Sequence, residues 1–266
     1  MATEPHVAVS GNLSVAWTEI FLHLLTTGVD DLSPVVVNVS EFENGVPVEI
    51  PEARARLDAD LLARGKRSVQ TVANTIFPES LWRPGTPNND ADLYARYERV
   101  WPRIRHDRAN RNGVYFRRLT SFSSSSHPND APVNQLQRMI EIFRDGTHRR
   151  SALQAGLFDP TGDHRNGPYL GFPCLQQIAF TPLGADGLAI TGFYAVQYQL
   201  EKAYGNYLGL CRLGRFVGAQ LGRSLRRMTC MASLVSRGEF SKADLAALGQ
   251  NLRNVIAGRR EEPRLP

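Results

Sequence analysis

The chain has 266 residues, 42% of them hydrophobic and 21% charged, and its formal net charge is +5. A chain of this size and ordinary globular composition can bury a full core in one large domain or two small ones. No stretch reaches the length of a membrane-spanning helix, and the residues from Met1 to Ser10 lack the apolar run of a signal peptide. We therefore expect a soluble, cytoplasmic protein without membrane contact.

Cysteine spacing and charge distribution narrow the possible functional classes of the protein further. The three cysteines cannot all pair, and their spacing matches no zinc-binding pattern, so we predict a reduced protein without a metal site. Basic residues outnumber acidic ones by 31 to 26, but apart from short clusters they are spread along the chain. A nucleic-acid-binding face would need a basic stripe with stacking aromatic residues. A pocket for an anionic small molecule explains the arginines equally well.

Apolar spacing in the first half of the chain predicts mainly helices. Ser14 is a candidate cap for a first helix, and Gly28 is its expected stop. The segment from Val69 to Phe77 is apolar but of undecided type. The other expected elements are a valine-rich buried strand from Pro34 to Val39, a helix from Glu52 to Ala63, and a long helix from Asp90 onward.

The second half alternates strands with helices. An amphipathic helix is expected to enter at Pro132 and to close at Gly146. The expected strands are Gly113 to Leu119, Ser151 to Phe158, Leu175 to Thr181, Leu188 to Gln199 and Met228 to Val235, and the expected helices are Tyr204 to Leu221 and Ser241 to Ile256. Strands in this sequential, mostly meander-like order predict an α+β domain, and no Gly-rich phosphate loop is present.

A cysteine at the entrance of a predicted strand is the first candidate for chemistry. Cys174 follows Pro173 directly before the strand, Arg149 and Arg150 stand as a pair upstream, and Asn206 opens a later helix. A cysteine thiolate is an effective nucleophile when positive charge lowers its pKa. Two guanidiniums can hold an anionic group bidentately. This combination predicts a nucleophile that faces a polar or anionic ligand.

Several motifs occur in an order that points to one protein family. In chain order they are Pro78-Glu79-Ser80-Leu81-Trp82, Trp101, Gly113-Val114-Tyr115, Asn134-Gln135-Leu136-Gln137, Arg149-Arg150, Pro173-Cys174 and Asn206. Their order and spacing resemble thymidylate synthase and the related pyrimidine nucleotide hydroxymethylases, over roughly residues 76–235. The resemblance implies a single α+β domain with a thymidylate-synthase-like mixed sheet and packed helices. Residues 1–75 would extend that domain, and 241–256 would form its C-terminal helix.

The resemblance also implies a reaction. It makes Cys174 the nucleophile that adds to a pyrimidine ring, Glu79 the residue that manages protons, and Tyr115 a neighbour of the nucleophile. The product would be methylated or hydroxymethylated at C5, and the sequence leaves both outcomes open. The one-carbon donor would be 5,10-methylenetetrahydrofolate, stacked on Trp101.

Substrate contacts and assembly follow from the same resemblance. Asn206 would read the edge of the pyrimidine. Arg149 and Arg150 would reach across the interface of a homodimer to the phosphate of the nucleotide in the partner subunit. The substrate would be a pyrimidine nucleotide or a related ring.

The chain departs from the family pattern at several binding positions. Leu175 replaces the histidine after the nucleophile, and the strand segment from Tyr194 to Tyr198 lacks the family's arginine, serine and aspartate. The segment from Cys230 to Val235 lacks the His-x-Tyr pair that holds the sugar, and the tail from Arg259 lacks a small apolar ending. Losing a charged contact costs about 2 kcal/mol or more when the phosphate is still to be bound. A different nucleotide, a nucleoside or another anionic ring therefore suits these residues better than deoxyuridylate.

Other interpretations of the same residues stay open. Taken singly, Cys174, Trp101 and Tyr115 are typical core residues, and Asn206 is a typical helix cap. A relative that binds a nucleotide or a partner protein without catalysis would explain the lost contacts. An RNA-binding protein is a third alternative, based on the basic balance alone.

Overall fold

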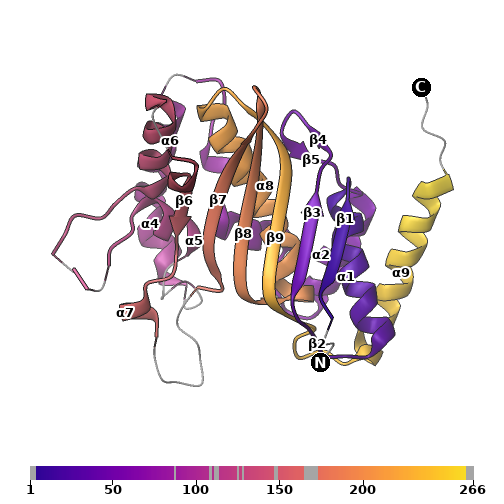
Figure 1. Ribbon diagram of the computed structural model, residues 1–266. Coiled ribbons are helices and arrows are strands. Elements are labelled where there is room, and N and C mark those ends of the chain that lie inside the picture. Colours follow the sequence, from indigo (N-terminus) through magenta and orange to yellow (C-terminus); the bar gives the residue numbers. More distant parts are fainter. Residues whose placement is uncertain are drawn as a thin grey trace.

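A mixed β-sheet forms the centre of the fold (Figure 1). The computed structural model describes residues 4–86, 88–107, 110, 114–124, 126–127, 129–146, 149–164 and 173–261, without the side chains of 259–261. Within that part, seven strands make up the sheet, in the order β1-β3-β9-β8-β7-β6, with β2 also paired to β9. Their bounds are β1 His6–Ser10, β2 Asp31–Leu32, β3 Val35–Val39, β6 Gln154–Gly156, β7 Leu175–Leu183, β8 Gly187–Tyr198 and β9 Ser224–Ser236. A separate hairpin pairs β4 (Phe42–Glu43) with β5 (Val46–Pro47).

The strand directions explain why the sheet needs a long crossover. β8 runs parallel to β9, whereas β7 is antiparallel to both β6 and β8. β1 is parallel to β3, and β3 is antiparallel to β9. Consecutive parallel strands cannot be joined by a tight turn, so the chain returns through a helix. That helix is α8 (Tyr204–Gln220), preceded by a π-helical turn, η4 (Gln199–Ala203).

The helices lie behind the sheet and beyond its two edges. Figure 1 shows α8 and α1 behind the strands, α4, α5 and α6 beyond the β6 edge, and α9 beyond β1. The bounds are α1 Leu13–Thr27, α2 Pro51–Ala63, α3 Val69–Ile76, α4 Asn89–His106, α5 Tyr115–Thr120, α6 Gln135–Asp145, α7 Pro160–Asp163 and α9 Lys242–Glu261, with 3-10 turns at η1 Glu79–Leu81 and η3 Arg150–Ala152. In the described residues, no helix is long and apolar enough to cross a membrane.

Helix α8 is buried on two sides. On the sheet side, a Cβ placed on Gly192 of β8 would lie 2.8 Å from the Leu210 side chain, so the strand and the helix are in close contact. On the other side, a Cβ on Gly205 would lie 2.6 Å from Val72 of α3. Glycine removes the side chain that would separate the two backbones. Helix α8 is therefore held between the sheet and α3.

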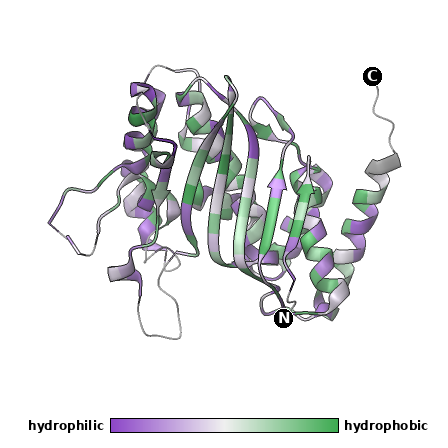
Figure 2. Ribbon diagram, viewed as in Figure 1, coloured by the Kyte–Doolittle hydropathy of each residue, from purple (hydrophilic) through white to green (hydrophobic). Residues whose placement is uncertain are grey.

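The opposite face of the sheet is covered by none of the described helices in Figure 1. Val7 and Val9 of β1 are 54% and 67% exposed, while Ala8 between them is fully buried. Phe193 and Met231, which are register partners on β8 and β9, are 39% and 42% exposed. Figure 2 shows β1 and β3 as strongly hydrophobic strands. The alternation therefore leaves apolar side chains on a face that meets solvent.

The structure confirms the coarse fold prediction and corrects parts of it. It has one domain with a mixed sheet and packed helices, whereas its likeness to thymidylate synthase stays a prediction. The meander-like order holds for β6, β7 and β8 but is wrong for β8 and β9, which are parallel. The sequence analysis also missed β1.

Two predicted strands are wrong or too long. Of the expected strand from Gly113 to Leu119, the residues from Tyr115 onward form helix α5, Val114 is its extended N-cap, and Gly113 lies outside the described residues. Phe116 and Leu119 stand three residues apart and are both fully buried, so packing overrides the strand preference of the segment. The expected strand from Ser151 to Phe158 is reduced to β6 because η3 occupies its start.

Two helix starts also differ from the prediction. Asn12, not Ser14, caps α1, and its side chain accepts hydrogen bonds from the backbone N–H groups of Ser14 and Val15. The Ser14 hydroxyl is buried and accepts from the N–H of Ile50 at 2.7 Å. The helix predicted to enter at Pro132 begins at Gln135, with Asn134 as its cap.

The close contact between α8 and α3 can be tested by substituting the glycine that lies at it. A Cβ on Gly209 would lie 2.9 Å from the carbonyl oxygen of Ala73 and 2.9 Å from the Ile76 Cβ. Overpacking of this kind costs about 1–3 kcal/mol, more than the helix gains from alanine. We expect Gly209→Ala to lower the free energy of unfolding in urea. The control is Gly258→Ala in α9, where no atom lies within 4 Å, and it should be neutral or stabilising. Equal effects of the two changes would show that the α3–α8 contact is looser than described.

Candidate functional site

Cys174 lies at the start of β7 and is held there by the neighbouring strand. Its carbonyl oxygen accepts a hydrogen bond from the N–H of Ala195 on β8 at 2.9 Å. The side chain is free of any disulfide and partly buried. The preceding Phe172 lies outside the described residues. The cysteine thus sits at the entrance of the strand, as the sequence predicted.

Tyr115 is brought to Cys174 by helix α5. The Tyr115 hydroxyl lies close to the backbone of Cys174 and Leu175. Burial is the main cause of the raised pKa of this phenol. The Tyr115 ring also meets Tyr194 of β8 edge-on, with ring centroids 6.4 Å apart. The structure therefore places the predicted tyrosine beside the predicted nucleophile, although on a helix rather than on a strand.

The electrostatic surroundings of Cys174 keep its thiol protonated in the free protein. Burial raises the pKa of the Cys174 thiol, and the nearby positive charge of Lys202 opposes that rise. Burial likewise lowers the pKa of Lys202, while Glu201 and Cys174 act in the opposite direction. Lys202 lies in the π-helical turn before α8, and turns of this kind are frequent at functional sites. The sequence analysis missed Lys202. The sequence did contain a sign of it, because a lysine between a predicted buried strand and a predicted buried helix needs a partner for its charge.

A buried polar cluster lies between the sheet and α8 next to these residues. The Gln197 amide donates to the Cys230 sulfur at 3.8 Å, and the Tyr207 hydroxyl donates to the Gln197 oxygen at 3.2 Å. The Tyr194 hydroxyl is buried and has no hydrogen-bond partner in the described part of the chain. Burial is the main cause of the raised pKa of Tyr194, and the negative charge of a Cys174 thiolate would raise it further.

Glu79 is not brought to the cysteine. It begins η1, and its carboxylate pairs with the Arg212 Nε at 2.9 Å and the Arg215 Nη1 at 3.6 Å. Both arginines belong to the middle of α8. Among the contacts of the described residues, none joins Glu79 to Cys174. The predicted proton manager is therefore tied to a different group of charges.

The remaining predicted residues, Asn206, Arg149 and Arg150, lie at different depths in the fold. Asn206 is in the first turn of α8 and is only 4% exposed. Arg149 and Arg150 are both exposed at η3, next to β6. An exposed arginine pair is available to a second molecule. No described contact brings the pair to Cys174 within the same chain.

Trp101, the predicted folate platform, contacts Arg117 and Tyr97. The Arg117 guanidinium lies over its ring at 5.3 Å from the centroid, and the Tyr97 ring is 6.1 Å away. Trp101 is partly buried and packs against the hydrophobic core. These contacts engage part of the ring, and the role of Trp101 in holding 5,10-methylenetetrahydrofolate stays a prediction. We assign no step to this donor.

Metal ligands and relatives give no further constraint. Within the described residues, no group of three or more His, Cys, Asp or Glu side chains is placed to hold a metal ion. The sequence matches no protein-family model, and no curated protein matches it at a significant level.

Proposed function

We propose that the chain is a divergent thymidylate-synthase-like enzyme in which Cys174 adds to C6 of a pyrimidine ring. The observation that carries this proposal is the junction of Cys174, Tyr115 and Lys202 at the start of β7. In this reaction the thiolate forms a bond to C6, and the electron pair displaced from the ring makes C5 nucleophilic. C5 would then bond to the methylene carbon of an electrophilic one-carbon donor, with the donor's amine as leaving group. Loss of the C5 proton would leave an exocyclic methylene, and addition of a hydride or of water to that carbon would expel the thiolate.

Lys202 has a defined role in this proposal. Because burial holds the Cys174 pKa above its ordinary value, a nearby charge has to stabilise the thiolate when it forms. Lys202 is the positive charge that acts on the thiol. Tyr115, whose hydroxyl lies close to the backbone of Cys174 and Leu175, would help to position the strand entrance.

The substrate proposed is a pyrimidine nucleotide or a related ring that carries an anionic group. The exposed Arg149 and Arg150 would hold that group in the site of a partner subunit, and Asn206 would contact the ring. The bare, apolar face of the sheet around Phe193 and Met231 supports a homodimer, because burying it in a second copy would remove apolar surface from water. Whether the one-carbon product is methyl or hydroxymethyl is left open.

A second candidate function is a non-catalytic relative that binds a nucleotide or a partner protein. Two observations favour it. The thiol of Cys174 has a raised pKa, whereas covalent catalysis at neutral pH needs a thiolate. Glu79 is engaged by Arg212 and Arg215 instead of facing the cysteine. The following experiments distinguish the two candidates.

Deuterium exchange tests addition of Cys174 without any one-carbon donor. If the thiolate adds to C6, the ring takes a deuteron from D2O at C5, and loss of the C5 proton with expulsion of the thiolate returns a deuterated base. We expect uridine or cytidine nucleotides to gain deuterium at C5 with the parent protein and not with Cys174→Ala, measured by mass spectrometry. Exchange by both proteins, or by neither when circular dichroism shows both folded, would favour the non-catalytic relative.

The pH profile of alkylation tests the role of Lys202. Burial raises the Cys174 pKa and Lys202 counteracts that rise, so Lys202→Met should raise the pKa further. At neutral pH the rate of modification by iodoacetamide should fall about threefold to tenfold, since one pKa unit corresponds to about a tenfold change in thiolate. Lys202→Arg keeps the charge and should restore most of the rate. An unchanged pH profile in Lys202→Met would show that Lys202 does not act on the Cys174 thiol.

Subunit mixing tests the shared arginines. Arg149→Ala and Cys174→Ala subunits are each expected to be defective in C5 exchange. Random mixing should restore about a quarter of the parent activity, because half of the dimers are mixed and each holds one intact site. If the mixture stays inactive while the parent protein exchanges deuterium and sediments as a dimer, the arginines do not act across the interface.

A further inference from the structure

A second group of charged side chains lies apart from the cysteine, between α2, α3 and α8. Arg212 and Arg215 come from α8, Gln70 from α3, and Arg54 and Asp58 from α2. This α2–α8 cluster is completed by Glu49, which precedes α2, and by Glu79 of η1. No part of the proposed reaction at Cys174 uses it.

Arg212 is the most deeply buried charge of the cluster. The residue is 8% exposed, and burial is the main cause of the lowered pKa of its guanidinium. Its Nη2 donates to the Gln70 Oε1 at 2.7 Å, and its Nε pairs with Glu79. Its Nη1 is buried and has no hydrogen-bond partner in the part of the chain that the structure describes. Leaving a buried charged donor unpaired is unfavourable. A ligand that offered an acceptor to this nitrogen would therefore be stabilised.

Arg54 lies beside Arg212 and is loosely held. Its Nη2 donates to the same Gln70 oxygen at 3.3 Å, so one amide oxygen serves two guanidiniums. Its other contacts are 3.4 Å to Glu49 and 4.0 Å to Asp58. Strong charge-assisted hydrogen bonds are about 2.7–2.9 Å long. The contacts of Arg54 are long enough for an anion to displace them.

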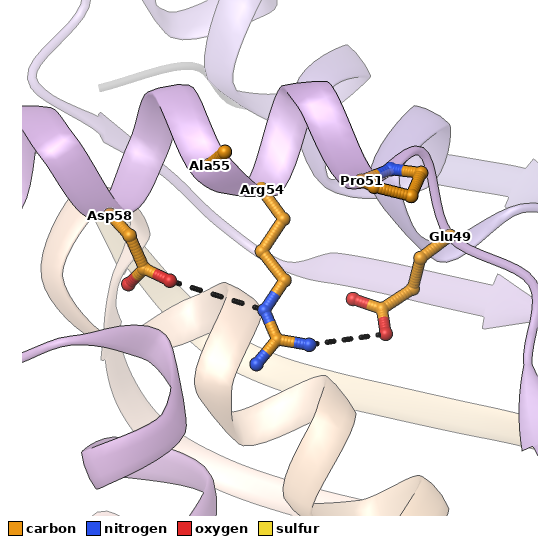
Figure 3. Close-up of a pocket in the computed structure, with 5 residues that line it drawn as sticks. All are labelled: Glu49, Pro51, Arg54, Ala55 and Asp58. Atoms are coloured by element: carbon orange, nitrogen blue, oxygen red, sulfur yellow. Dashed lines mark hydrogen bonds and ion pairs between the residues drawn. The ribbon is translucent and has the colours of Figure 1, made fainter.

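A cavity opens at Arg54. It has a volume of about 270 Å³ and is lined by Glu49, Pro51, Arg54, Ala55 and Asp58 (Figure 3). Figure 3 shows the Arg54 guanidinium between the carboxylates of Asp58 and Glu49. Ligand pockets in proteins are roughly 300–1,000 Å³. This cavity is slightly smaller, so it admits only a small molecule or ion, and Arg212 is not among the residues that line it.

The surrounding hydrogen bonds allow Arg54 to move without leaving Glu49 alone. The Tyr204 hydroxyl donates to Glu49 Oε1 at 2.8 Å, and Ser14 shares a hydrogen bond of 2.8 Å with the same hydroxyl. Glu49 therefore keeps a partner when Arg54 turns away. Gln70 likewise keeps its shorter contact with Arg212.

We infer that the α2–α8 cluster binds a small oxyanion, a carboxylate or a phosphate group, between Arg54 and Arg212. The anion supplies the acceptor that Arg212 Nη1 lacks and relieves the repulsion between two adjacent guanidiniums. Arg54 leaves its shared oxygen on Gln70 and binds the anion from the cavity side. Asp58 and Glu49 at the cavity wall favour a ligand that also carries a cationic or hydroxyl group.

Anion titrations of the thermal unfolding midpoint test this site. Sodium phosphate and sodium acetate are added separately to the full chain at constant ionic strength, with sodium chloride as the reference. We expect one of the two anions to raise the midpoint in a saturable way, since binding to the folded state stabilises it by mass action. Arg54→Gln should weaken the apparent affinity about tenfold, the loss of one charge-assisted contact of about 1.4 kcal/mol. Arg56→Gln, an exposed change on the same helix, should leave it unchanged.

Two further variants make the outcome unambiguous. Arg212→Lys keeps the charge but loses the unpaired nitrogen, and it should weaken binding even where Arg212→Gln fails to fold. The double variant Arg149→Ala/Arg150→Ala should retain the saturable response, which separates this site from the proposed phosphate clamp. No saturable response to either anion would show that water alone meets Arg212 and would overturn the inference. So would equal losses in Arg54→Gln and Arg56→Gln, or loss of the response only in the double variant.

Discussion

The burial of α8 between the sheet and α3 is the constraint on which the rest of the structure depends. Because β8 and β9 are parallel, the chain must return along the sheet before β9 can pair, and α8 makes that return. Gly192 and Gly205 allow close contact on the two sides of the helix. A helix buried in this way has few places for polar side chains. Each polar residue on α8 must therefore find a partner inside the protein or bind one from outside.

Helix α8 thereby organises two separate polar systems. Its first turn and the π-helical turn before it carry Asn206 and Lys202, on the side of Cys174. Its middle carries Arg212 and Arg215, which take Glu79. Arg212 is buried, so losing Glu79 would leave its charge without this carboxylate, although the Glu79 side chain itself is 35% exposed. Glu79 is therefore held by Arg212 and is poorly placed to exchange protons at Cys174. Proton movement in the proposed reaction falls to groups at the cysteine itself.

The sequence predicted the elements whose signals are local and missed the contacts that are not. β7, β8 and α8 follow from long apolar runs bounded by glycine or polar residues, and their predicted positions agree closely with the structure, whereas β9 begins at Ser224, four residues before the predicted Met228. The segment of α5 was misassigned because its aromatic residues favour strands, whereas the buried Phe116 and Leu119 select a helix. No local pattern could show that Glu79 pairs with Arg212. Arg212 is a charged residue within an otherwise apolar helix, and this was the one sign in the sequence that it needs a buried partner.

The same distinction applies to the candidate site. The position of Cys174 at a strand entrance and the proximity of Tyr115 were predicted, because both depend on motif order along the chain. The charge that acts on the thiol was not predicted. The departures from the family pattern remove an arginine from the strand that ends at Tyr198, and the sequence offered no clear replacement. Lys202 lies four residues beyond that strand end, in a turn whose π-helical geometry is not readable from residue types.

The pKa shifts at Cys174 and Lys202 run in opposite directions. Burial raises the pKa of the thiol and lowers the pKa of the amine. The ordinary values, about 8.5 for cysteine and about 10.4 for lysine, already lie within about two units of each other. Shifts in these directions narrow the difference, and proton transfer between groups of similar pKa is easier than between free groups. Burial that raises a thiol pKa is also typical of an unreactive structural cysteine. In the proposed reaction the bound substrate therefore has to bring hydrogen bonds or charge that favour the thiolate, because excluding water alone favours the neutral thiol and amine.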